Sequence, residues 1–326
     1  MLEHGGKLRE AAQRYGRNDW LDLSTGLNPG GYPAPALASD AWHRLPENDP
    51  ALLQAAQCYY RAPRMLAVAG TQAAIQALPR LRAPSRVVIA SPSYAEHLHH
   101  WSQHGHRTSP VPYSELDAAV ATADVVVVCN PNNPTGAFVP RATLLRWAEA
   151  LATRGGWLVV DEAFADTDGA HSLADATQAA GLVVLRSVGK FFGLAGLRLG
   201  FVAARDDILA PLADMLGPWA VSGPAQQVAR AALEDSAWQG AAQEKLHAAG
   251  TRLRALLASH GIASNGTSLF QWWPEPLAEE FHDHMARRGI WVRLFREAAR
   301  GIRLGLPSDE AGWQRLELAL NEWTNR

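Results

Sequence analysis

Lysine is scarce in this sequence of 326 residues, which contains only Lys7, Lys190 and Lys245. Cysteine is rarer still, because Cys58 and Cys129 are the only two. Two cysteines exclude a framework of several disulfides and are typical of a reducing compartment. The 30 basic residues nearly balance the 32 acidic ones, so the net charge of −2 gives no indication of a nucleic acid or an anionic membrane as partner.

Long hydrophobic runs are also missing from the chain. The longest aliphatic stretches have the length of a strand, far below the roughly 20 residues of a membrane-spanning helix. The first residues include Glu3, His4 and Lys7 and lack the apolar core of a signal peptide. Because 48% of the residues are apolar, we expect a globular protein with a sizeable core. The cysteine content and the first residues favour a cytoplasmic protein, and no membrane association is expected.

Short apolar segments alternate with helical patterns between about residue 49 and residue 203. The strands are expected at residues 65–69, 86–90, 108–111, 125–129, 157–160, 182–185 and 197–203. Such alternation is typical of a three-layer α/β domain. A turn rather than a helix joins the last two strands, which allows one of them to run antiparallel.

The final third of the chain has the pattern of a smaller α+β module. Its strands are expected at residues 269–272, 291–295 and 301–306, before a terminal helix at 311–323. We therefore predict three parts: an N-terminal segment, 1–35, packing with the small domain and active site, a large domain, 36–220, and a small domain, 221–326.

Lys190 follows the strand at 182–185 and lies in a turn between apolar residues and glycines. Burial lowers the pKa of a lysine, and the neutral amine is a nucleophile that forms Schiff bases. Ser187 and Arg198 flank it, and a hydroxyl with a guanidinium suits a nearby phosphate. This segment alone leaves open that Lys190 is a surface lysine at a strand end.

Further polar residues also come directly after predicted strands. They are Gly70, Thr71, Gln72, Tyr94, Asn133 and Asp161. Ligands of open α/β sheets bind beyond the carboxyl ends of the strands. The segment 70–72 begins a helix and offers backbone N–H groups to a phosphate, and Tyr94 can stack on an aromatic ligand. An ordinary helix entry and a packed tyrosine are the alternative interpretations.

Three segments together resemble a known family. Residues 130–136 read N-P-N-N-P-T-G, residues 161–164 read D-E-A-F, and residues 187–198 contain S-x-x-K followed by an arginine. In order and kind they resemble the pyridoxal-phosphate (PLP) enzymes of fold type I, the aspartate-aminotransferase superfamily. The resemblance implies PLP as cofactor, and a three-layer α/β/α large domain with a seven-stranded mixed sheet beside a smaller α+β domain.

The resemblance also implies roles for individual residues. Lys190 is the lysine that forms a Schiff base with PLP, Asp161 pairs with the pyridine nitrogen, and Asn133 hydrogen-bonds the phenolic oxygen and lies near the substrate. The other predicted cofactor ligands are Gly70, Thr71, Gln72, Tyr94, Ser187 and Arg198. No metal is expected. The active sites of this family lie at a subunit interface, so a homodimer is expected.

Within the superfamily the chain is most similar to the threonine-phosphate decarboxylases. They convert L-threonine O-3-phosphate to CO₂ and (R)-1-aminopropan-2-yl phosphate, which is used in cobalamin (vitamin B12) biosynthesis. The similarity rests on residues 4–6, 28–29, 161–164, 196–200 and 218–219. Lys7, Gly26 and Leu45 depart from the pattern, which has two asparagines and a tyrosine that reaches the partner's cofactor phosphate.

The substrate, an amino-acid phosphate, has two anionic ends. By resemblance, Arg303 binds its carboxylate, and Arg293 on a neighbouring strand binds its phosphate together with His4 and the Asn28 loop. The alternative is that both arginines are solvated strand residues. Two other functions stay open: an aminotransferase of the histidinol-phosphate type, and a PLP-fold binding protein without turnover.

The helix expected at 94–104 carries His97, His100 and His104 at a spacing that places them on one face. Such a face can bind a metal, but carboxylates that would orient the imidazoles are sparse here. We favour a polar, partly solvated helix face.

Overall fold

The computed structural model describes residues 5–325, which form two compact units. The large unit contains residues 31–133 and 137–240. The small unit contains the described part of residues 1–30, residues 134–136 and residues 241–325. The division therefore falls at residues 30 and 240, whereas the sequence suggested 35 and 220. Among residues 5–325, no helix has the length and apolar character needed to cross a membrane.

The large unit is built on a mixed seven-stranded sheet in the order β2-β8-β7-β6-β5-β3-β4. The strands are β2 (Met65–Val68), β3 (Arg86–Ser91), β4 (Arg107–Pro112), β5 (Val125–Cys129), β6 (Trp157–Asp161), β7 (Leu182–Ser187) and β8 (Gly200–Ala203). Strand β8 is antiparallel to β2 and β7, and the other pairs are parallel. The predicted fold class and the antiparallel strand are confirmed.

The predicted strand 197–203 is three residues too long. Residues Ala195–Leu197 form a 3-10 turn, and Arg198 adopts a left-handed backbone conformation with φ 52°. A left-handed residue interrupts the extended backbone that a strand needs. Strand β8 therefore begins only at Gly200.

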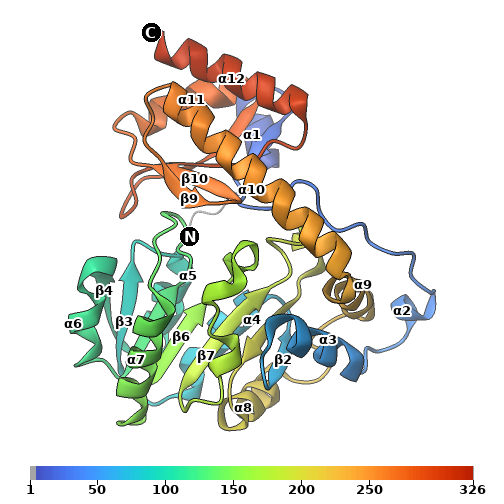
Figure 1. Ribbon diagram of the computed structural model, residues 1–326, viewed down its shortest axis with the longest axis vertical. Helices are drawn as coiled ribbons and strands as arrows, with labels where there is room; N and C mark the ends of the chain where they lie inside the picture. Colours follow the sequence, from blue (N-terminus) through green and yellow to red (C-terminus); the bar gives the residue numbers. More distant parts are fainter. Residues whose placement is uncertain (1–4, 326) are drawn as a thin grey trace. The chain divides into compact units, whose positions relative to one another are not determined.

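Helices cover both faces of this sheet, as Figure 1 shows for α7 on the near face. The helices are α2 (Asp40–His43), α3 (Pro50–Tyr60), α4 (Thr71–Ala77), α5 (Ala95–Gln103), α6 (Leu116–Val120), α7 (Arg141–Ala152), α8 (Asp206–Leu216) and α9 (Gly223–Glu234). Short 3-10 turns lie at Leu78–Leu81, Tyr113–Glu115, Ala165–Thr167, Gly169–His171 and Ala174–Ala176. Helix α10 (Ser236–Ser259) begins in this unit and continues in the small one.

The core of the large unit follows from strand alternation. In β5, Val125 and Val127 pack in one cluster with Ile75 of α4, while Val126 and Val128 are equally buried on the opposite face. A strand that is apolar on both faces can be stable only between two layers of helices. Each fully buried valine contributes about 1.5–3 kcal/mol relative to an exposed one.

The small unit contains a five-stranded sheet in the order β1-β11-β12-β10-β9. The strands are β1 (Leu21–Leu23), β9 (Asn265–Thr267), β10 (Phe270–Trp273), β11 (Ile290–Phe295) and β12 (Gly301–Gly305), and the helices are α1 (Leu8–Tyr15), α11 (Ala278–Arg287) and α12 (Glu310–Thr324). Strand β1 pairs in parallel with β11. Helix α11 was not predicted, although buried Phe281 and Met285 have helical i, i+4 spacing.

Candidate active site

The structure brings the nine predicted cofactor residues together around one cavity of the large unit. Gly70, Thr71, Gln72, Tyr94, Asn133, Asp161, Ser187, Lys190 and Arg198 all line it. Cys129 and Phe164 also contribute to its wall. The residues come from segments up to 128 positions apart, as counted from Gly70 to Arg198.

Sheet topology explains why these residues meet. Asp161 and Ser187 are the last residues of the parallel neighbours β6 and β7, and Asn133 follows β5. Gly70 and Tyr94 follow β2 and β3. All five strands run in the same direction, so their carboxyl ends lie at one edge of the sheet, where open α/β folds bind ligands.

The three asparagines of the turn at residues 130–136 have different tasks. Asn130 exchanges two hydrogen bonds with the backbone of Val139, at 3.1 and 2.8 Å. The side chain of Asn132 donates to the carbonyl of Pro92 at 2.9 Å. These bonds fix the loop, and Asn133 is the member of the motif that lines the cavity.

Close approach of Arg198 to Gly70 shapes one part of the cavity. Gly70 has a positive φ of 73°, and a Cβ there would lie 2.7 Å from a guanidinium nitrogen of Arg198. Only glycine fits this position without displacing the arginine. The guanidinium and the hydroxyls of Thr71 and Ser187 line the same cavity, a donor set that suits a phosphate.

Lys190 is the lysine of the cavity. Its Nζ lies 5.3 Å from the centroid of the Phe164 ring, and the next two residues in the chain, Phe191 and Phe192, are fully buried. Lys7 and Lys245 belong to the small unit, where Lys7 pairs with Glu10 and Lys245 is exposed. Lys190 is half-buried and lines the cavity together with Phe164, and its role toward a cofactor stays a prediction.

Asp161 is held by two hydrogen bonds, one from its own loop and one from helix α5. Its Oδ1 accepts a hydrogen bond from the backbone of Ala163 at 3.0 Å, and its Oδ2 lies 3.0 Å from His97 Nε2. Burial alone lowers the pKa of His97, but hydrogen bonds with Asp161 and Cys129 outweigh it and raise that pKa to about 10. The charged imidazolium of His97 therefore lies directly against Asp161.

The histidine face of α5 is partly solvated, as the sequence suggested, but its first histidine is buried beside the site. His97 is 1% exposed and contacts Asp161, and His100 hydrogen-bonds the buried Glu96 at 3.0 Å. His104 alone of the three is exposed. The sequence missed His97 as a site residue because β3, which precedes α5, is not adjacent to β6 in the sheet. The sequence did offer one indication, because His97 lies one helical turn after Tyr94, a predicted cofactor residue.

Ligand-type atoms of His97, Cys129 and Asp161 lie within 4.8 Å of one another. In this arrangement the histidine and the aspartate are already joined by a hydrogen bond. The expectation that the protein uses no metal stays a prediction.

Two predicted substrate arginines lie opposite one another in the small unit. Arg293 of β11 and Arg303 of β12 are register partners in an antiparallel pair, so their side chains share one face of the sheet. Arg303 is buried, donates to the carbonyl of Ser24 at 2.9 Å and lies over the ring of Phe270. Burial, and after it the charge of Arg293, lowers the pKa of Arg303 to about 9. Two cations on one face suit an anionic ligand.

The other predicted substrate residues are less informative. Asn28 is buried in the small unit, and its side-chain oxygen accepts from the backbone of Gly30 at 2.9 Å, which closes a local turn. His4 lies outside the described residues. Asn133 lines the cavity of the large unit. Their roles toward a substrate stay predictions.

The cavity fits PLP on the basis of its own residues. It combines a lysine, a carboxylate that is hydrogen-bonded to a histidine, an aromatic ring and a cluster of cationic and hydroxyl donors. PLP requires these groups for its aldehyde, its pyridine nitrogen, its ring face and its phosphate.

Comparison with known proteins agrees with this geometry. A sequence model of the family "Aminotransferase class I and II" matches residues 18–316. The threonine-phosphate decarboxylase of Pseudomonas aeruginosa is 51% identical over 98% of this chain and 97% of that protein. The protein of the same name from a Sinorhizobium species is 43% identical over 98% and 97%.

A solved structure shows the same fold. The histidinol-phosphate aminotransferase from Sinorhizobium meliloti, determined in complex with pyridoxal-5'-phosphate, superposes with a TM-score of 0.86. The alignment covers 99% of this chain and 95% of that one at 24% identity. With its mixed seven-stranded sheet, its strand-end cavity and a family match over most of its length, the chain belongs to the class I and II aminotransferase family.

Proposed function

We propose that this protein is a PLP-dependent decarboxylase that converts L-threonine O-3-phosphate to (R)-1-aminopropan-2-yl phosphate and CO₂. The cavity that unites Lys190 and Asp161 with phosphate-binding donors is the observation that carries the proposal. Identity of 51% and 43% to threonine-phosphate decarboxylases over nearly the whole chain supports this substrate. The product would then serve cobalamin biosynthesis, as the sequence resemblance implies.

The residues that would hold the cofactor are those that line the cavity. Arg198, Thr71 and Ser187 would bind the phosphate, and Tyr94 would cover a ring face. Asp161, hydrogen-bonded to His97, would face the ring nitrogen. When bound, PLP supplies an electron sink for the charge left on the substrate Cα as CO₂ departs.

Lys190 would move the proton of the reaction. Cleavage of the bond between Cα and the carboxylate releases CO₂ and leaves an electron pair on Cα. An amine on a flexible four-carbon chain can hold a proton and deliver it to that carbon. The proton completes the amine product, and no second substrate is consumed.

The reaction requires that the carboxylate bond, rather than another bond of Cα, be the one that breaks. We propose that Arg303 binds the carboxylate and that Arg293, with His4 and the Asn28 loop, binds the phosphate. The shared face of Arg293 and Arg303 supports an anionic ligand for both. Fixing both ends of a substrate determines the orientation of the atoms between them.

A product assay tests the proposal. Purified protein is incubated with PLP and L-threonine O-3-phosphate, and CO₂ is measured without any 2-oxo acid. Release of CO₂ at a stoichiometry of about one per amine formed supports decarboxylation. Transamination of histidinol phosphate that depends on a 2-oxo acid, with no CO₂, would overturn it in favour of an aminotransferase. A protein that binds PLP and turns over neither compound would be a binding protein.

We further propose that the active protein is a cytoplasmic homodimer. Trp42 and Leu45 are 66% exposed and Trp219 is 56% exposed, although large apolar side chains are usually covered. Their segments adjoin, because a Cβ on Gly223 would lie 2.7 Å from the carbonyl of Ala41. A second copy is the partner expected for this family. Sedimentation of the active protein as a monomer would contradict the proposal, and Trp42→Arg should shift a dimer toward monomer.

A further inference from the structure

A chain of hydrogen bonds leads away from the cavity through two of its wall residues. The hydroxyl of Tyr94 donates to Gln72 Oε1 at 3.2 Å, and Gln72 Nε2 donates to Glu96 Oε2 at 2.7 Å. Tyr94 and Gln72 line the cavity, whereas Glu96 does not. Glu96 is 9% exposed and lies in the first turn of α5.

Glu96 decides which way the amide of Gln72 points. An ionised carboxylate can only accept, so it must face the NH₂ end of the amide. The amide oxygen is then directed to the hydroxyl of Tyr94, which can donate to it. Burial, and after it the charge of Glu96, raises the pKa of Tyr94 to about 12, so the hydroxyl keeps its proton.

His100 holds Glu96 from the other side. Its Nε2 lies 3.0 Å from the same carboxylate oxygen that accepts from Gln72. Both residues belong to α5, four positions apart, and their side chains are 12% and 11% exposed. A carboxylate hydrogen-bonded to two partners loses most of its freedom to rotate, which makes it a rigid support.

We propose that Glu96 is a positioning residue for the cofactor cavity, which fixes the amide of Gln72 and through it the hydroxyl and ring of Tyr94. The inference deepens the proposed function and rests on it where the ligand is PLP. A ring already held in the orientation that a ligand needs loses less conformational entropy on binding. Helix α5 would then support the cavity twice, with His97 behind Asp161 and Glu96 behind Gln72.

A double-mutant cycle on PLP affinity tests the inference. Glu96→Gln keeps the size of the side chain but lets either end of the Gln72 amide face it. Tyr94→Phe keeps the ring and removes the hydroxyl. Each single change should raise the Kd for PLP about five- to tenfold, measured by absorbance titration of the cofactor-free protein. The double variant should bind no more weakly than the weaker single variant, because both changes remove the same constraint.

The inference would be overturned if the Kd of the double variant rose by the product of the two single factors, or if Glu96→Gln left the Kd unchanged. Glu149→Gln is the matched control, because Glu149 is an exposed glutamate of α7 in the same unit, and its Kd should equal that of the unaltered protein. If Glu96→Gln does not fold, Glu96→Asp, which shortens the side chain that reaches Gln72, replaces it in the cycle with Tyr94→Phe, with the same two outcomes.

The same cycle on urea unfolding of the cofactor-free protein separates this inference from the proposed function. Non-additive unfolding free energies support the hydrogen-bonded chain even if PLP does not bind at all, and additive ones count against it. Failure of the unaltered protein to bind PLP would overturn the proposed function alone.

Discussion

Adjacent residues at the ends of β6 and β7 belong to two different environments. Asp161 and Ser187 line the cavity, whereas their chain neighbours Glu162 and Arg186 face the other way and are almost fully buried. Alternation along a strand is the cause, because successive side chains point to opposite faces. Two carboxylates that are adjacent in the sequence can therefore have separate tasks, one in chemistry and one in the fold.

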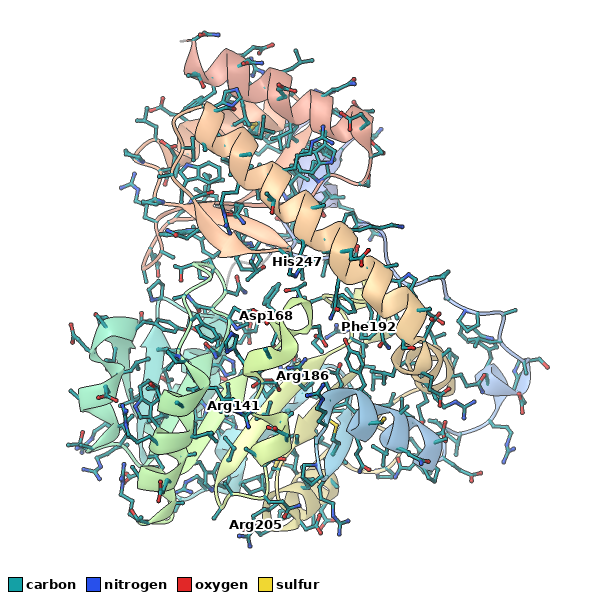
Figure 2. The ribbon with its side chains drawn as sticks, in the orientation of Figure 1. Arg141, Asp168, Arg186, Phe192, Arg205 and His247 are labelled. Atoms are coloured by element: carbon teal, nitrogen blue, oxygen red, sulfur yellow. The ribbon has the colours of Figure 1, made fainter. Side chains whose placement is uncertain are left out.

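The buried residues of these two strand ends, Glu162 and Arg186, belong to an ionic cluster. Arg186 donates to Glu162 at 2.5 Å and to Asp166 at 3.0 Å, and Ser172 donates to Glu162. Arg186 lies inside the large unit, as Figure 2 shows. Burial raises the pKa of Glu162 despite the nearby guanidinium. The cluster joins β6 to β7 next to the residues that face the cavity.

The largest effect is expected on the cavity side, at Lys190. Lys190→Ala should lower turnover by at least about 10³-fold, because it removes the amine proposed to attach the cofactor and move the proton. The visible absorbance of bound PLP should change as well. Lys245→Ala is the control and should be fully active, since Lys245 is exposed in the small unit. Turnover of Lys190→Ala at the normal rate would remove Lys190 from its role.

Asp161→Asn should leave PLP bound and lower kcat by about 10²–10³-fold. The carboxamide cannot hold a proton on the ring nitrogen, and the charge that balances His97 is lost. Steady-state kinetics would measure kcat, and the absorbance of the bound cofactor would show whether PLP is retained. An unaltered kcat would show that Asp161 does not have the chemical role that separates it from Glu162.

Glu162→Gln should have the opposite profile. Loss of one charge from the buried cluster should lower the free energy of unfolding by about 3 kcal/mol, as Arg186 then has a weaker partner. The kcat of the folded fraction should change less than twofold, because Glu162 does not line the cavity. Urea unfolding and kinetics on one preparation give both values. If Glu162→Gln had normal stability and a low kcat, Glu162 would have a role in the reaction and not in the fold.

Stability should depend on pH through His97. Its pKa is raised from 6.5 to about 10 in the folded protein, so its contribution is complete below pH 6.5 and is lost as the pH rises toward 10. The free energy of unfolding should fall by up to about 1.4 kcal/mol per pH unit in this window. Urea unfolding at pH 7, 8 and 9 should show a steeper decline for the unaltered protein than for His97→Asn, and parallel declines would contradict the pairing.

A comparatively small effect, on cofactor binding, is expected at Arg198, which is exposed although it lines the cavity. Arg198→Ala should weaken PLP binding about tenfold, the lower end for a charge-assisted contact, because solvent screens it. Thr71→Ala and Ser187→Ala should weaken it less. Arg205→Ala is the control, since Arg205 is an exposed arginine outside the cavity (Figure 2). Equal Kd values from equilibrium dialysis for both arginine variants would exclude Arg198 as a phosphate ligand.

Local patterns in the sequence were sufficient for most elements of the large unit. Strand-length apolar runs such as residues 125–129 and capped helices such as α3 carry their own signals, because hydrophobic periodicity and caps act over a few residues. The motif residues were also predictable, since Lys190 and Asp161 follow strands and matched a known pattern. The short edge strand β1 and the helix α11 were not, because short or weakly bounded segments are stabilised mainly by tertiary packing.

By itself the sequence determined the family, the fold class and the residues that gather at the strand ends, because alternating strands and helices restrict a sheet to few topologies. Which polar residues support those at the cavity was decided only by the tertiary structure. His97 meets Asp161 across 64 positions and Glu96 meets Gln72 across 24. Such contacts depend on the order of strands in the sheet and on the rotation of α5 about its axis. Neither is encoded in any local stretch of the chain, because both result from packing the whole unit.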